Sequence, residues 1–140
     1  IAFEISADVS GRLILLDANA SGEVIQLFPN SYLSANEGRF VESGTRMIVP
    51  DSQNPAYRGL KSFQAVEPVG RGRLIAIVVP KKVLVDDAIA PERFATPFNA
   101  EPAPASFLMN LVDRLLAAIS ADGGNTDGWA FTESSYEIVK

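Results

Sequence analysis

Apolar residues recur at helical spacing in only one stretch of this sequence, residues 106–121. The stripe consists of apolar residues three or four positions apart, namely Phe107, Leu108, Leu111, Val112, Leu115, Leu116 and Ile119. Ser106 is a suitable N-cap, and Gly123-Gly124 permits a left-handed backbone where the helix stops. Because parallel strands are usually joined by helical crossovers, a chain with one helix is expected to build an antiparallel sheet.

The rest of the sequence is divided into short apolar runs that end at Gly, Pro or Asn. Residues 3–9 alternate apolar and polar side chains, which is typical of a half-buried strand, and residues 12–17 form a continuous run typical of a central strand. Residues 19–22 favour a tight turn, so residues 23–28 are predicted to return as the antiparallel partner until Pro29. Further strands are predicted at residues 40–41, 45–49, 62–66, 74–79 and 128–139, with turns at Gly44 and at residues 68–72.

These runs predict one α+β domain over residues 1–140, since 47% apolar residues suffice for a single core. We expect a mainly antiparallel β-sandwich or open barrel of about six to eight short strands with one C-terminal amphipathic helix. Residues 1–80 supply the β core, 81–105 a Pro-rich strap, 106–121 the helix and 128–139 the closing strand. A mixed α/β sheet is the alternative. Phe94 and Phe98 are expected to anchor the strap, and the polar composition of residues 51–59 predicts a surface loop outside the core.

The sequence contains no His and no Cys. This absence excludes Ser-His-Asp and Cys-His nucleophile systems and the common zinc sites, so we predict a non-catalytic domain without a metal or cofactor. Two catalytic routes remain. The first is a pair of carboxylates, but among 17 acidic residues some pair lies close by chance, so the sequence does not identify a specific one. The second is a serine activated by a lysine, but the four lysines are expected to stay hydrated: Lys61, Lys81, Lys82 and Lys140. Residues 122–128 carry oxygen ligands but lack the acidic spacing of a calcium loop, so a helix-ending turn is predicted there.

Charge and hydropathy narrow the class of partner. A net charge of −5 argues against nucleic acid as a binding partner, because binding to nucleic acid requires Lys and Arg to neutralise its phosphates. The longest apolar run, residues 74–80, is far shorter than the roughly 20 residues of a membrane span, so no membrane insertion is expected. Ile1 stands where a full-length chain has Met, and we therefore expect a fragment or a processed chain.

The stretch Gly22-Glu23-Val24, followed by Leu27-Phe28-Pro29-Asn30, resembles the bacterial family called domain of unknown function 4384. Further positions of the family pattern follow in order, covering residues 11 to 80: Asn36, Gly44, Ile48-Val49-Pro50, Phe63, Pro68-Val69-Gly70 and residues 74–78. The resemblance implies an accessory domain of a larger protein, often attached to a caspase-like peptidase. It also implies export, so a periplasmic or cell-envelope location is expected. It assigns no catalytic residue.

The candidate binding residues are Asn30, Tyr32, Asn36 and Tyr57. Both tyrosines lie in loops without an obvious core partner in sequence, and Tyr is enriched at protein interfaces. The alternative is that each ring covers a sheet edge and that Asn30 caps the turn after Pro29. We therefore predict a non-catalytic module that binds a ligand, a protein partner or an attached peptidase domain, with a weak carboxylate-based hydrolase and a structural spacer as alternatives. The sequence leaves the oligomeric state open.

Overall fold

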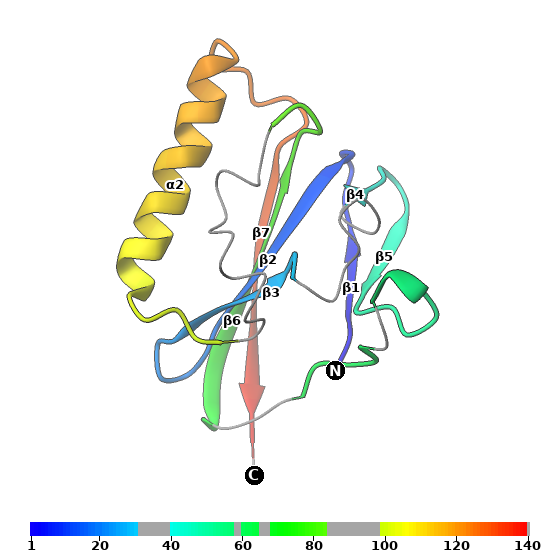
Figure 1. The fold of residues 1–140 in the computed structure, drawn as a ribbon, viewed down its shortest axis with the longest axis vertical. Helices are drawn as coiled ribbons and strands as arrows, with labels where there is room; N and C mark the ends of the chain where they lie inside the picture. The colour runs from blue at the N-terminus through cyan, green and yellow to red at the C-terminus, as the bar shows by residue number, and fades with distance from the viewer. Residues whose placement is uncertain (31–39, 58–59, 65–67, 84–98, 140) are drawn as a thin grey trace.

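The computed structural model describes residues 1–30, 40–57, 60–64, 68–83 and 99–139 (Figure 1). Within these ranges it contains two sheets, one α-helix and one 3-10 helix: β1 (Phe3–Ser6), β2 (Gly11–Ala18), β3 (Val24–Phe28), β4 (Phe40–Val41), β5 (Arg46–Val49), η1 (Pro55–Tyr57), β6 (Gly70–Val79), α2 (Pro104–Ala121) and β7 (Ala130–Ile138). All pairings between these strands are antiparallel. The predicted α+β class with an antiparallel, unclosed sheet and one C-terminal helix is therefore confirmed.

Strand β2 is the centre of the larger sheet, whose strand order is β3-β2-β6-β7, with β4 pairing the start of β2. Its continuous apolar run is explained by burial on both faces. Leu13 and Leu15 enter one core cluster, whereas Ile14 and Leu16 enter another on the opposite face. Strand β6 continues both clusters with the same alternation, because successive side chains of a strand point to opposite faces.

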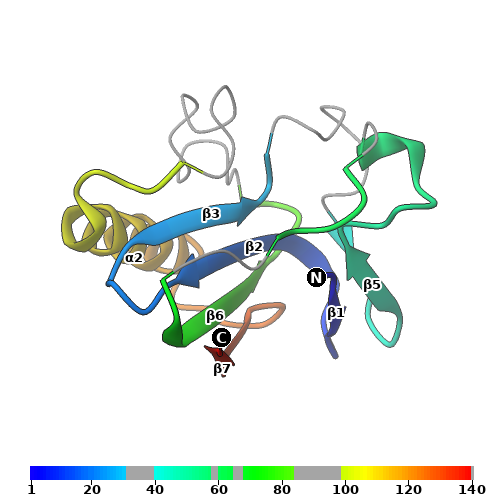
Figure 2. The same ribbon diagram turned by 90° about the horizontal axis from the view of Figure 1, so that it is seen from below.

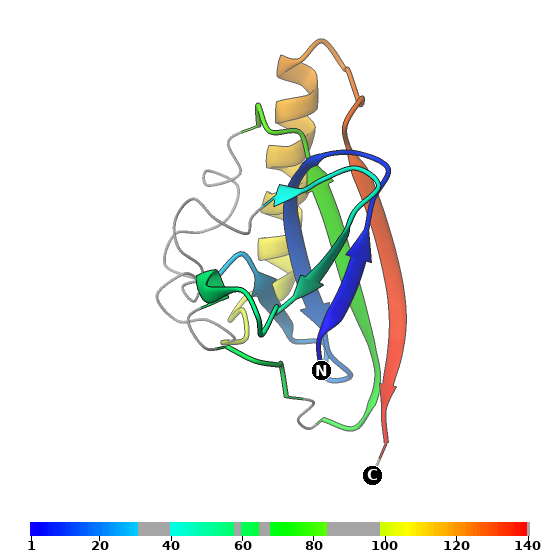
Figure 3. The same ribbon diagram turned by 90° about the vertical axis from the view of Figure 1, so that its right-hand side faces the viewer.

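The two faces of this sheet are covered by different elements. The two-stranded sheet of β1 and β5 lies on one side and α2 lies on the other, as Figures 2 and 3 show from two directions. Helix α2 contributes Leu111 to its cluster as a buried residue, with Phe107, Leu108 and Leu115 partly buried beside it. Pro104 at the first helical turn and Gly123 and Gly124 with positive φ after the last turn account for its ends.

Several boundaries differ from the sequence prediction. The turn predicted over residues 68–72 is wrong from Gly70 onward, because β6 begins there and pairs with β7. Residues 62–64 of the strand predicted over 62–66 are not in a strand, and the last two lie outside the described residues. Helix α2 begins at Pro104 with Ala103 as N-cap and no side-chain cap, so Ser106 is not the cap. Phe94 and Phe98 also lie outside the described residues.

The largest correction concerns residues 51–59, which were expected to stay outside the core. Tyr57, on the short helix η1, is only 2% exposed. Its ring lies 6.4 Å from that of Phe28 between centroids, and its hydroxyl donates to the carbonyl of Ile48 at 3.3 Å. The composition of this segment is polar, yet one aromatic residue is enough to bring it into the core.

Candidate functional site

A cleft of about 1000 Å³ lies at the end of the central sheet where β2 and β7 finish and β3 begins. The start of β1 and residues 60–64 form its other wall. The described residues that line it are Ile1, Phe3, Asp17, Asn19, Glu23, Ile25, Leu27, Leu60, Ser62, Phe63, Gln64, Ala100, Tyr136, Glu137, Ile138 and Val139. Most of the lining surface is apolar, and a few polar groups converge at one end, which is the usual composition of a small-molecule site.

The apolar wall is formed by two aromatic rings from distant parts of the chain. Phe3 and Phe63 lie 5.8 Å apart between ring centroids and are tilted by 35°. Backbone hydrogen bonds hold their segments together, because the nitrogen of Ile1 donates to the carbonyl of Phe63 at 2.5 Å and the amide of Phe63 donates back at 2.7 Å. Residues 60–64 are therefore attached to the start of β1 although they belong to no strand.

The polar end of the cleft is formed by Asp17 and Tyr136. The Tyr136 hydroxyl donates to Oδ1 of Asp17 at 2.6 Å, across the intervening strand β6. Gly72, which pairs with Tyr136, makes this reach possible, because a Cβ at Gly72 would lie 2.4 Å from Cζ of the tyrosine. The missing side chain at Gly72 thus leaves room for a phenol that crosses the sheet to a carboxylate.

The surroundings of this pair shift both acidities. Burial raises the pKa of Asp17 above its ordinary value, and the hydrogen bond from Tyr136 acts in the opposite direction. Burial, together with the hydrogen bond to Asp17 and its negative charge, raises the pKa of the Tyr136 phenol. Tyr136 is therefore a proton donor in this bond at neutral pH, and Asp17 is its acceptor.

Beside the pair, the β2–β3 turn presents a third polar group to the cleft. Asn19 Nδ2 donates to the Glu23 carboxylate at 2.7 Å, and the Ser21 hydroxyl also contacts it at 3.3 Å. Asn19 Oδ1 in turn accepts the backbone amides of Ser21 and Glu23 at 3.1 and 3.0 Å. These bonds fix the turn and hold the Glu23 carboxylate at the cleft with few ways to move.

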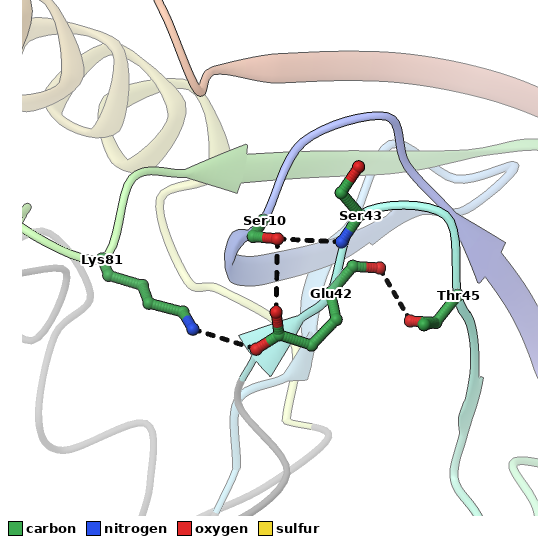
Figure 4. Close-up of polar contacts among 5 residues, drawn as sticks. All are labelled: Ser10, Glu42, Ser43, Thr45 and Lys81. Carbon is green, nitrogen blue, oxygen red and sulfur yellow. Dashed lines mark hydrogen bonds and ion pairs between the residues drawn. The ribbon is translucent and has the colours of Figure 1, made fainter.

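A second polar cluster lies at the other end of the molecule, where the β1–β2 loop meets the β4–β5 turn (Figure 4). The Glu42 carboxylate accepts Lys81 Nζ at 2.9 Å and the Ser10 hydroxyl at 3.3 Å, while Ser10 Oγ accepts the amide of Ser43 at 2.8 Å. The bound ammonium lowers the pKa of Glu42. The cluster therefore joins two loops to the end of β6. It does not resemble a lysine-activated serine, because Lys81 and Ser10 both bind the Glu42 carboxylate.

The structure separates the four predicted binding residues. Asn30 is 1% exposed, and its Nδ2 donates to the carbonyl of Leu27 at 2.7 Å, as the capping alternative requires. Tyr57 is buried in the core, so the prediction that its ring projects toward a partner is wrong. Its burial agrees with the alternative, in which the ring covers the sheet. Burial also raises its pKa to about 12. Tyr32 and Asn36 lie outside the described residues.

Sequence reasoning missed Asp17, Gly72 and Tyr136, which are the residues that the cleft brings together. Asp17 continues the alternation of Leu13 and Leu15, so its side chain lies on the same face as theirs. This position in the alternation could have identified Asp17 from the sequence, because an acidic residue that faces the core needs a polar partner. Gly72 was read as part of a turn, which hid its pairing with Tyr136.

The loop at residues 122–128 has the predicted helix-ending character. The amide of Asp122 donates to the carbonyls of Ala118 and Ile119, and Gly123, Gly124 and Gly128 have positive φ. The Asp122 carboxylate pairs with Lys82. Within the described part of the chain, no group of three or more acidic side chains is placed to hold a metal ion.

Comparison with models of known protein families identifies a match. The model of the family described as a domain of unknown function (DUF4384) covers residues 1–82. The chain belongs to this family. No curated protein and no solved structure matches the chain. In the part of the chain described here, no helix is long and apolar enough to cross a membrane.

The family match includes most of the cleft. Asp17, Glu23 and Phe63 fall within residues 1–82, whereas Tyr136 comes from the later part of the chain. The cleft of this DUF4384 chain is therefore completed by β7, a strand that lies outside the matched residues.

Proposed function

We propose that this DUF4384 chain is a non-catalytic accessory domain that binds a ligand in the cleft around Asp17 and Tyr136. The observation that carries the proposal is the composition of the cleft, about 1000 Å³ of mainly apolar space with a hydrogen-bonded carboxylate and phenol at one end. Apolar walls supply affinity, and a few fixed polar groups supply orientation. We further propose, from the resemblance to the family, that the domain is part of a larger, exported bacterial protein and is attached to a caspase-like peptidase domain.

Three aliphatic probes with different head groups test this function: octylamine, octan-1-ol and octanoate. Each is titrated into the ¹⁵N-labelled chain, and the amide shifts of residues 17–25 and 136–139 are followed. We expect saturable shifts at these residues with at least one probe. Shifts distributed over the whole surface, or none with any probe, would contradict a binding cleft.

A pair of variants separates the cleft from general surface binding. Ile138→Glu places a charge in the cleft, and Ile48→Glu places the same charge on β5, where Ile48 is 47% exposed and does not line the cleft. We expect the first variant to abolish the shifts and the second to leave them unchanged. Equal losses in both variants would count against the cleft as the site.

One observation favours the second candidate function, a carboxylate-based hydrolase. Asp17 and Glu23 both line the cleft, and a carboxyl group with a raised pKa is what general acid catalysis uses. Against it, the Tyr136 hydroxyl already occupies Oδ1 of Asp17. Turnover assays with glycoside and ester substrates decide between the two functions. Turnover that is lost in Asp17→Asn would establish the hydrolase, whereas no turnover in the wild-type chain would favour the binding domain.

A further inference from the structure

Two carboxylates are neighbours at the polar end of the cleft. Asp17 lies opposite Ile25 in the β2–β3 register, and the amide of Asn19 donates to the carbonyl of Glu23 where the two strands turn. Asp17 and Glu23 are therefore diagonal neighbours on one face of the sheet, roughly 7 Å apart between Cβ atoms. Both residues line the cleft. A single small head group of a ligand can therefore lie between the two carboxylates.

Each of these carboxylates leaves one oxygen for a ligand. Oδ1 of Asp17 accepts the Tyr136 hydroxyl, and Oε2 of Glu23 accepts Asn19 and Ser21. The other oxygens, Oδ2 of Asp17 and Oε1 of Glu23, have no hydrogen-bond partner among the described residues. The Tyr136 hydrogen is already donated to Asp17, so the phenolic oxygen is a third acceptor. A head group that donates several hydrogen bonds therefore suits this end of the cleft.

The basic groups near the cleft do not neutralise the two carboxylates. The described residues that line it include no Lys and no Arg, and Lys61, although it lies between two lining residues, is not one of them. The amino group of Ile1 donates to the carbonyl of Phe63 in the apolar wall. In the described part of the chain, no basic group forms an ion pair with Asp17 or Glu23. Their negative charge is therefore available to a ligand.

Strand β7 and its neighbour β6 direct their charged side chains away from the cleft. Arg71 is an even number of positions before Ile77, which packs toward α2, so Arg71 lies on the face that α2 covers. Its register partner Glu137 lies on that same face. Tyr136, the next residue along, therefore points to the opposite face and into the cleft. Neither Arg71 nor Glu137 alters the charge that faces a ligand.

We propose that the cleft selects an aliphatic ligand with a primary ammonium head group over one with a hydroxyl or a carboxylate. This inference rests on the proposed function and names the class of ligand for the same site. The apolar wall, which includes Phe3 and Phe63, contacts the aliphatic chain. The ammonium supplies three donors and a positive charge to the acceptors at the polar end, whereas a hydroxyl supplies one donor and no charge. A carboxylate head group would meet two like charges.

Octylamine, octan-1-ol and octanoate have the same chain length and differ in the head group, so their affinities test this selection. Dissociation constants are measured at neutral pH from the amide shifts of residues 17–25 and 136–139. We expect octylamine to bind about tenfold more tightly than octan-1-ol, because hydrogen bonds to charged groups are stronger than those between neutral groups. We expect no saturable shifts with octanoate.

Variants assign the selection to the two carboxylates. Asp17→Asn and Glu23→Gln each remove one charge and still accept the bonds from Tyr136 and Asn19, so both are expected to fold. Each is expected to reduce the preference for octylamine over octan-1-ol about threefold, and the double variant to abolish it. Asp113→Asn is the matched control. Asp113 is exposed on α2 and does not line the cleft, so we expect its loss to leave the preference unchanged.

Three results would overturn the proposal. The first is binding of octan-1-ol or octanoate in the cleft at least as tight as that of octylamine, which would leave the proposed binding function in place. The second is a preference for octylamine that persists in the double variant. The third is an equal loss of preference in Asp113→Asn, because general attraction of cations to a chain of net charge −5 would then explain it. The binding function itself fails under a different result, when no probe gives saturable shifts confined to the cleft.

Discussion

The two faces of the central sheet are covered by different means. On the face that β1 and β5 cover, called the β1–β5 face below, three separate parts of the chain cover the sheet: the pair β1 and β5, η1 with Tyr57, and residues 60–63. On the helix face, one continuous element, α2, covers the sheet and contributes Leu111 as its single residue below a tenth exposed among the described residues. One face therefore depends on side chains brought from distant parts of the sequence, and the other depends on a local periodic pattern.

This difference predicts where the fold is most sensitive to substitution. Removing one side chain from the β1–β5 face is expected to disconnect a segment, because each segment there is attached to the core by few side chains. On the helix face, the neighbours of a truncated side chain belong to the same helix and hold it in place. The predictions that follow test this contrast, beginning with the largest expected effect.

The first prediction concerns Tyr57, whose aromatic ring is buried on the β1–β5 face. Tyr57→Ala is expected to lower the free energy of unfolding by about 3–5 kcal/mol, the range for deletion of a large buried ring. Tyr57→Phe keeps the ring and loses only a hydrogen bond to Ile48 of 3.3 Å, so about 1 kcal/mol is expected. Urea unfolding measures both. A loss below about 1 kcal/mol in Tyr57→Ala would show that η1 does not close this face.

The second prediction uses two leucines on the same helix. Leu111→Ala is expected to cost about 2–4 kcal/mol, because Leu111 is 3% exposed between β2 and β6. Leu116→Ala is expected to change stability by less than about 0.5 kcal/mol, because Leu116 is 55% exposed. Equal losses from both leucines in urea unfolding would mean that the outer flank of α2 is covered in solution, and the contrast between the faces would fail.

The third prediction concerns the glycine under Tyr136. Gly72→Ala is expected to cost about 1–3 kcal/mol, because the new Cβ and the tyrosine ring cannot occupy the same space. Displacement of the ring also breaks its bond to Asp17, so the variant is expected to lose the probe shifts in the cleft. Gly22→Ala is a matched control for the fold, since a Cβ there meets no atom within 4 Å and its cost is limited to the positive φ of 84°. A Gly72→Ala chain with wild-type shifts would remove the Asp17–Tyr136 pair from the site.

The same contrast explains how much of the fold was predictable from the sequence. The helix and the strands β2, β3, β6 and β7 were found because hydrophobic period is a local property. The role of Tyr57 was not found, because its burial depends on Phe28, which is far away in the sequence. Nothing in the composition of residues 51–59 reports that contact.

The candidate site was less predictable than the fold for a related reason. Asp17 and Tyr136 are 119 positions apart, and their contact depends on the register of β6 against both neighbours and on Gly72 at the crossing point. The absence of His and Cys restricted the classes of chemistry that the sequence analysis considered, but it located no residue. A site assembled by strand register is visible only once the register is known.

The last prediction compares two carboxylates and has the smallest expected effect. Burial raises the folded-state pKa of Asp17, so its contribution to stability is fully present below the unfolded pKa and is lost as the pH rises through the folded pKa. Lys81 lowers the pKa of Glu42, so its contribution is present above the unfolded pKa and is lost as the pH falls. The melting temperatures of Asp17→Asn and Glu42→Gln, each compared with wild type at pH 3 and pH 7, are therefore expected to change in opposite directions.

Relative to wild type, Asp17→Asn gains stability as the pH rises, because the wild-type chain must ionise a partly buried carboxyl while Asn still accepts the Tyr136 bond. Glu42→Gln loses stability over the same interval, and it does so less at high salt because Glu42 and Lys81 are exposed. If both variants moved in the same direction with pH, Asp17 would have to be a solvated carboxylate like Glu42, and the polar end of the cleft would lie open to water.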